Sequence, residues 1–331
     1  MTLDLDADDA LLHEGFVFRM VLQHEYQHNK TILQSLQLKK NGPYEPVGRL
    51  RPPPPPQSDA FDDIDMADFP GGWVEIGTND RSGAYDNERP LHRIELSPFS
   101  VDMGPVTEGA YARFIAGGGY QAREYWSEIG WAWRAEHNIT HPKYWRHTEG
   151  SWHVRMMDRV LPLDERRPVC HVSYYEAEAY ARFVGKRLPT EFEWEAAATW
   201  DPSAGTKRRY PWGDEAASDE LANVDVLTFG PAAVGSYVRN VSPIGCYGMI
   251  GDVWEWTSST FNAYPGYEMF PYPEYSEVFF GDDHRVLRGG SWATGVGAIR
   301  GTFRNWDYPI RRQIFSGIRC VRGVGSTDDQ G

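Results

Sequence analysis

Apolar residues recur every three or four positions near the start of the chain, at Leu12, Phe16, Met20, Val21, Ile32, Leu33 and Leu36. This spacing predicts one amphipathic helix over about residues 9–39, which the Asn-Gly-Pro sequence at 41–43 would end. His24 and His28 are four residues apart, so they would lie one turn apart on one face, with Gln27 beside them. Two such imidazoles can bind one metal ion, although a surface pair without metal is the commoner outcome of this motif alone.

A linker is expected to join this helix to the rest of the chain. Five consecutive prolines at 52–56 predict an extended polyproline II segment, and the acidic stretch at 59–68 continues it. We therefore expect a helical segment over 1–45, a linker over 46–70, a folded domain over 71–325 and a tail over 326–331. Because one helix cannot bury its apolar face alone, it must pack on the larger domain, on a second copy, or on helices outside this chain.

The pattern changes at Gly71. Short apolar segments at 71–78 and 92–107, broken by Gly, Pro and Asn, predict strands, and helices are predicted at 108–115, 173–183 and 191–198. Ser173 and Glu176 form a capping box, and Thr190 is suited to cap the third helix. After Tyr210 the chain has few periodic segments. The sequence thus predicts an α+β domain with a loop-rich body, which aromatic packing and structural Ca²⁺ could stabilise.

Composition narrows the function classes. The net charge of −14 argues against non-specific binding to nucleic acid or to an anionic membrane. Three cysteines, at 170, 246 and 320, are too few and too scattered for a disulfide framework. No apolar run reaches 18 residues, and the N-terminus lacks the pattern of a signal peptide. A cytoplasmic protein without a membrane or nucleic-acid partner is the expectation.

Several motifs follow one another along the predicted domain. They are GGWVEIGT at 71–78, ERPLHRIEL at 88–96, RPVCHVSYYEAEAYARFVGKRLPTEFEWEAAA at 167–198, YPWGD at 210–214, GCYGMIGDVWEWTSS at 245–259, RVLRGGSW at 285–292 and FSGIRCVR at 315–322. Together they resemble the formylglycine-generating-enzyme-like (sulfatase-modifying-factor) domain, which implies a C-type-lectin-like fold. Thr294 and Ile299 stand where those enzymes carry a cysteine pair, so thiol-based copper chemistry is not expected.

Two further motifs point to another branch of this superfamily. HEYQH stands at 24–28, and RNWDYPIRRQIFSGIR at 304–319. With the proline-rich linker between them, they resemble the EgtB-like sulfoxide synthases of ergothioneine biosynthesis, in which a DinB-like helical domain precedes the same fold. On this resemblance, residues 1–45 are a partial DinB-like segment.

The resemblance implies a specific reaction. Non-haem Fe(II) held by three histidines would use O₂ to join the sulfur of γ-glutamylcysteine, or of cysteine, to the imidazole C2 of hercynine (trimethylhistidine) as a sulfoxide. It assigns His24 and His28 to iron, Tyr272 to proton donation, Gln27, Tyr275, Asn305 and Trp306 to hercynine, and Asp307 and Arg311 to the charged ends of the thiol substrate. Tyr264 and Tyr267 share the spacing of the Tyr272–Tyr275 pair but lack the serine that follows it.

The sequence departs from this family in one respect. Upstream of His24 the only histidine is His13, which on a continuous helix would lie about 16 Å away along the axis. A third ligand is therefore missing, and we expect an N-terminally truncated chain. Two alternatives stay open: a selenoneine- or ovothiol-type synthase on the same scaffold, and a catalytically inactive binding domain.

Overall fold

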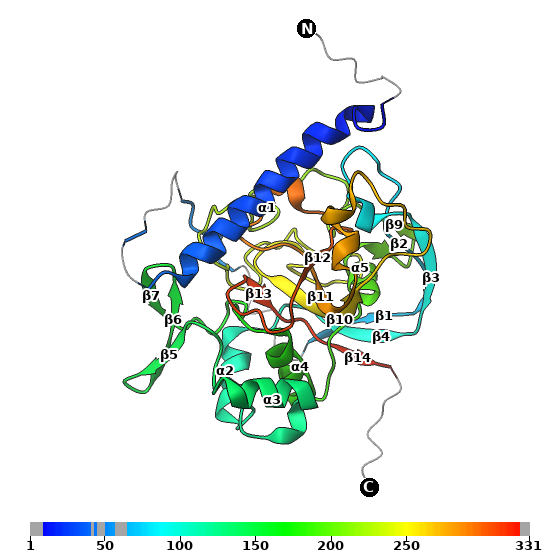
Figure 1. Ribbon diagram of the computed structural model, residues 1–331. Coiled ribbons are helices and arrows are strands. Elements are labelled where there is room, and N and C mark those ends of the chain that lie inside the picture. Colours follow the sequence, from blue (N-terminus) through cyan, green and yellow to red (C-terminus); the bar gives the residue numbers. More distant parts are fainter. Residues whose placement is uncertain (1–8, 41–42, 45–49, 57–64, 325–331) are drawn as a thin grey trace.

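The computed structural model describes residues 9–40, 43–44, 50–56 and 65–324 (Figure 1). A long helix, α1 (Phe16–Leu38), lies along one side of a mixed body of short strands and helices. The predicted helix is right in type but begins too early, because His13–Gly15 forms a separate 3-10 turn (η1). Glu14 and Gly15 have positive φ values of 49° and 74°, which an α-helix cannot continue through.

The face that α1 turns towards the body is largely polar. Its buried residues are Phe16, Met20, Gln23, Lys30, Leu33, Gln34 and Gln37. Val21 and Ile32, which the apolar spacing predicted to face a core, are 55% and 56% exposed. Gln37 shows how a polar face packs: its amide Nε2 donates to the Arg155 carbonyl at 2.8 Å, and its Oε1 accepts from the Met157 amide at 2.5 Å. Of the three docking options, packing on the larger domain is the one observed.

Two glycines let α1 approach closely. A Cβ atom placed on Gly295 would lie 2.3 Å from the Tyr26 ring, and one on Gly297 would lie 2.7 Å from it. Any larger side chain at either position would therefore push the helix away. The loop that follows the GGSW motif is thus shaped to receive Tyr26, and with it the HEYQH turn.

Five small sheets form the body. Their strand orders are β1-β4-β14, β12-β11-β10-β13, β2-β3, β5-β6-β7 and β8-β9. The strands are β1 (Met66–Phe69), β2 (Gly72–Ile76), β3 (His92–Leu96), β4 (Phe99–Asp102), β5 (Trp145–Thr148), β6 (Ser151–Met156), β7 (Arg159–Pro162), β8 (Trp200–Asp201), β9 (Thr206–Lys207), β10 (Trp254–Phe261), β11 (Gly281–Arg288), β12 (Asn305–Asp307), β13 (Ser316–Gly317) and β14 (Val321–Gly323). The first of them lies inside the segment assigned to the linker.

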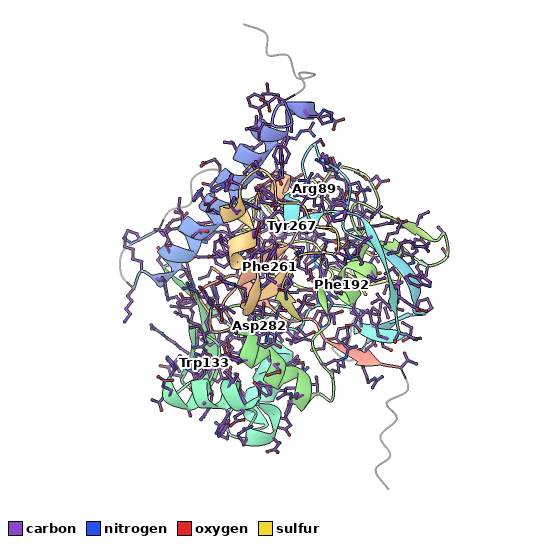
Figure 2. The ribbon with its side chains drawn as sticks, turned by 45° about the vertical axis from the view of Figure 1, so that its right-hand side comes forward. Arg89, Trp133, Phe192, Phe261, Tyr267 and Asp282 are labelled. Atoms are coloured by element: carbon purple, nitrogen blue, oxygen red, sulfur yellow. The ribbon has the colours of Figure 1, made fainter. Side chains whose placement is uncertain are left out.

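Four α-helices and five short 3-10 helices complete the body in the described residues. The α-helices are α2 (Glu108–Ala116), α3 (Glu128–Glu136), α4 (Tyr174–Phe183) and α5 (Glu191–Thr199). The three predicted from sequence are confirmed, as is the capping box of Ser173 and Glu176. The fourth helix, α3, was not predicted, because it lies in an aromatic-rich stretch without clear periodicity. In the view of Figure 2, Trp133 of α3 lies low on the body and Phe261 of β10 lies near its centre.

Large aromatic side chains and paired charges fill the interior. Trp254 and Trp256 of β10 are 2% and 0% exposed. The three cysteines are free and buried. Within the described ranges, no group of three or more His, Cys, Asp or Glu side chains could hold a metal ion. No helix in that part of the chain is both long and apolar enough to cross a membrane.

Candidate functional site

The site is built where α1 meets the C-terminal strands. Gln27 donates from Nε2 to the hydroxyls of Tyr85, at 3.1 Å, and Tyr275, at 3.0 Å. These two phenol rings stack with centroids 4.1 Å apart. Burial raises the pKa of Tyr85 to about 12 and that of Tyr275 well above its ordinary value, so both stay neutral. One glutamine of the HEYQH motif is thereby fixed against an aromatic pair of the body.

Trp306 forms an aromatic wall beside this pair. Its ring stacks on Phe261 with centroids 4.1 Å apart and meets Tyr275 edge-on at 6.2 Å. Strand β12, which carries it, pairs antiparallel with β11 and places Asn305 opposite Leu287 and Trp306 opposite Val286. The RNWD motif is therefore held at a sheet edge facing α1, and three predicted site residues from distant parts of the chain come together.

His24 and His28 lie one turn apart as predicted. Their ring centroids are 4.5 Å apart, His24 is half-buried and His28 is exposed. Two neutral imidazoles at this spacing fit two positions of a ferrous site. His13 is exposed in the 3-10 turn, and the described residues bring no third ligand to the pair. The donors present therefore fit iron in type but complete only part of its coordination.

Lys30 was not among the predicted site residues. It follows on the same helix face, is 8% exposed, and its Nζ lies 3.4 Å from Asn305 Oδ1 and 5.2 Å from the centre of the Trp254 ring. Burial lowers the pKa of this ammonium to about 8, against the opposing effect of Asp307. When a sequence is analysed alone, a lysine is normally expected to face solvent. Only the position of Lys30, three residues after Gln27 on the same helix, could have indicated that its side chain faces inward.

Asp307 and Arg311 pair with each other. Arg311 Nε lies 3.3 Å from Asp307 Oδ1, with 46% and 26% of the two side chains exposed. Burial raises the pKa of Asp307, while a hydrogen bond from the Tyr308 amide and the charge of Arg311 lower it. Both side chains are thus partly accessible to solvent. The carboxylate and the guanidinium that could bind an amino acid form an ion pair with each other.

The loop tyrosines differ in their partners. The Tyr264 hydroxyl donates to Glu191 Oε2 at 3.2 Å, and the Tyr267 hydroxyl donates to Asp86 Oδ2 at 2.8 Å. Tyr272 is 36% exposed, meets Tyr275 edge-on at 6.4 Å, and its hydroxyl makes no hydrogen bond with the described residues. Of the candidate proton donors, Tyr272 alone keeps its hydroxyl available and lies beside the aromatic site.

A hydrogen-bonded link behind the site was also missed. Arg300 donates to Gln23 Oε1 at 2.8 Å and to Glu88 Oε2 at 2.7 Å, while Gln23 Nε2 donates to the Gly83 carbonyl at 2.9 Å. Glu88 in turn accepts from the Tyr85 amide. Buried charge pairs between distant segments leave no periodic pattern, so these residues could not be connected from the sequence.

Comparisons with known proteins now bear on this site. The sequence model of a protein family, the Sulfatase-modifying factor enzyme 1-like domain, matches residues 54–324. The chain belongs to this family. It is 44% identical to the hercynine oxygenase of Mycolicibacterium thermoresistibile, in an alignment that covers 97% of this chain and 72% of that protein. It is 45% identical to the hercynine oxygenase of Mycobacterium tuberculosis, in an alignment that covers 96% of this chain and 74% of that protein. The solved structure of PvdO from Pseudomonas aeruginosa matches 80% of this chain and 97% of its own with a TM-score of 0.53 at 22% identity, which supports the fold alone.

Within this sulfatase-modifying factor family, the predicted loss of the cysteine pair has a structural counterpart. Thr294 is buried, and its hydroxyl accepts from the Ser291 amide at 2.9 Å. Ile299 is 2% exposed and belongs to an apolar cluster. Both side chains are part of the packing, and neither offers a thiol for copper chemistry.

Proposed function

We propose that the chain is a hercynine oxygenase: an iron- and O₂-dependent sulfoxide synthase of ergothioneine biosynthesis. One observation carries the proposal. Gln27 of the histidine helix hydrogen-bonds Tyr275, and Tyr275 meets Trp306 edge-on, so the two motifs that resemble such enzymes form one site. The curated relatives named hercynine oxygenase, aligned over almost the whole chain, support the same substrate.

The aromatic wall suits the trimethylammonium group of hercynine. A quaternary ammonium cannot donate a hydrogen bond, so it is bound by the faces of rings such as Trp306 and Tyr275. Gln27 and Asn305 offer amide groups for the rest of the molecule. Because Trp306 is fixed by stacking on Phe261, this surface is preorganised before the substrate arrives.

His24 and His28 would provide two of the iron ligands, and the metal would supply the activation of O₂. The overall reaction joins a thiol and the imidazole C2–H of hercynine with O₂, giving the C–S sulfoxide and water. Tyr272 would donate a proton near the metal, since its hydroxyl is available and close to the substrate wall. Asp307 and Arg311 would separate to bind the ammonium and carboxylate of γ-glutamylcysteine or cysteine.

Anaerobic Fe(II) titration followed by product analysis tests this function. We expect weak Fe(II) binding that His24→Ala or His28→Ala removes, with the exposed His13→Ala as the matched control. Added O₂, hercynine and a thiol should give a product with the mass of both substrates plus one oxygen atom and minus two hydrogen atoms. Iron binding that depends on His13 would contradict the ligand assignment.

Two alternatives lead to different results in the same assay. A selenoneine- or ovothiol-type synthase would give a product only with another sulfur or selenium donor, or with another position of the imidazole substituted. A catalytically inactive binding domain would bind hercynine and give no product with any donor. The incomplete set of histidine ligands in the described residues favours testing this last outcome directly.

A further inference from the structure

Lys30 differs from four deeply buried arginines of the molecule. Arg288, Arg300, Arg304 and Arg319 each lie within ion-pair distance of a buried glutamate. Lys30 has no carboxylate within 4.0 Å among the described residues, and its single acceptor, Asn305 Oδ1, is 3.4 Å away. An ammonium has three donors, and a buried charge without a counter-ion is costly. The charge of Asp307 acts on Lys30 from beyond ion-pair distance, so no described carboxylate contacts this ammonium.

A second unsatisfied donor lies in the same place. The indole Nε1 of Trp254 is buried and has no hydrogen-bond partner in the described part of the chain. The same ring lies under Lys30 Nζ, 5.2 Å from it. Buried polar groups in folded proteins are almost always hydrogen-bonded. An indole donor without an acceptor, beside an ammonium with one distant acceptor, therefore indicates a ligand that accepts.

We propose that Lys30 is a positioning residue that binds the carboxylate of the trimethylhistidine substrate. This inference rests on the function proposed above. Lys30 lies one helical turn beyond Gln27 and contacts Asn305, and both of these side chains belong to the site assigned to that substrate. A carboxylate at Lys30 would leave the trimethylammonium group of the same amino acid at the neighbouring aromatic wall.

The thiol substrate is the weaker candidate for this contact. The function proposed above assigns its carboxylate to Arg311, which is 46% exposed. Lys30 is 8% exposed and lies on the helix side of Asn305. A planar guanidinium that can be reached from solvent suits the second substrate, whereas a buried ammonium suits the one enclosed by the aromatic rings.

Equilibrium binding to the purified full chain tests the assignment without turnover. The two probes are trimethylhistidine and its decarboxylated analogue, which keeps the imidazole and the trimethylammonium. We expect Lys30→Met to weaken binding of trimethylhistidine roughly ten- to hundredfold and to leave binding of the analogue almost unchanged. Lys30→Arg should restore part of the affinity, and Lys39→Met, at the exposed end of the same helix, should have no effect.

The outcomes separate the two proposals. Equal weakening of both probes by Lys30→Met would show a structural role and overturn this inference. So would unchanged binding of trimethylhistidine, or a loss confined to γ-glutamylcysteine. If the unmodified chain bound neither probe, the proposed function would fail first and this inference with it. Thermal unfolding of Lys30→Met checks the fold, and we expect little loss of stability because Met replaces a buried charge outside any ion pair by an apolar chain of similar length.

Discussion

Two regions of this molecule bury charge in different ways. Beneath the central sheet, Arg319 donates from Nε and Nη2 to Glu255 and from Nη1 to the Asp102 carbonyl at 2.7 Å, and both charged side chains are almost fully buried. At the contact of α1 with β12, Lys30 is buried with a single distant acceptor. The first arrangement satisfies its donors within the chain. In the second, the described residues leave the donors of Lys30 and the Trp254 indole largely unsatisfied.

The difference separates scaffold from site. Glu255 also accepts from the Trp194 indole at 2.6 Å, and although burial opposes the charge, this carboxylate holds the pKa of Arg319 above its ordinary value. Such a pair fixes the positions of loops that have little regular structure. A site must instead keep its groups unsatisfied until the substrate binds. Removing a scaffold charge should therefore cost stability, and removing a site charge should cost binding.

The largest effect is expected at Arg319. Arg319→Met leaves Glu255 buried without its counter-ion, which should lower the free energy of unfolding by about 3–5 kcal/mol. Urea denaturation measures the change. Arg81→Met is the matched control, because its pair with Glu268 is 60% and 80% exposed and should contribute less than about 1 kcal/mol. A similar small change for both variants would remove the distinction between the two regions.

The second largest effect is expected in acid, where protonation of a buried glutamate should lower the stability of the fold. Burial opposes the charged form of Glu195, but Lys207 and Arg288 hold its pKa at about 2, below its ordinary 4.5. The stabilisation is therefore complete above pH 4.5 and is lost as the pH falls through 2; it amounts to about 3 kcal/mol. Denaturation at a series of pH values should show Glu195→Gln with a flatter acid limb. Glu268→Gln, at an 80% exposed position, should keep the wild-type slope.

The sequence predicted the scaffold better than the site. Patterns of neighbouring residues were enough to predict helix α4, because the side chains of Ser173 and Glu176 accept hydrogen bonds from each other's backbone amides within one turn. Such patterns failed to predict the buried face of α1. The apolar spacing predicted that Val21 and Ile32 are buried, but both are exposed, and Gln37 and Lys30 are buried instead. Docking through hydrogen bonds to a distant main chain leaves no periodic pattern. The histidine pair and the RNWD motif were recognisable only because they resemble a family.

The smallest change in stability, with a clear change in binding, is expected at Asp307. Its pair with Arg311 is accessible, so Asp307→Asn should alter the free energy of unfolding by less than about 1 kcal/mol. If this carboxylate binds the ammonium of the thiol substrate, its loss removes a charge-assisted hydrogen bond of about 1.5–3 kcal/mol. The KM for the thiol should then rise roughly ten- to hundredfold.

Steady-state kinetics with each substrate varied in turn decides whether Asp307 belongs to the site or to the scaffold. The KM for trimethylhistidine should stay nearly constant, because Asp307 is not among the groups assigned to it, which include Gln27, Asn305 and Trp306. Asp282→Asn, an exposed carboxylate on β11 (Figure 2), provides the matched control and should change neither constant. An equal rise in both KM values, together with a lower melting temperature, would instead place Asp307 with the paired charges of the scaffold. The substrate would then need a different anchor for its ammonium group.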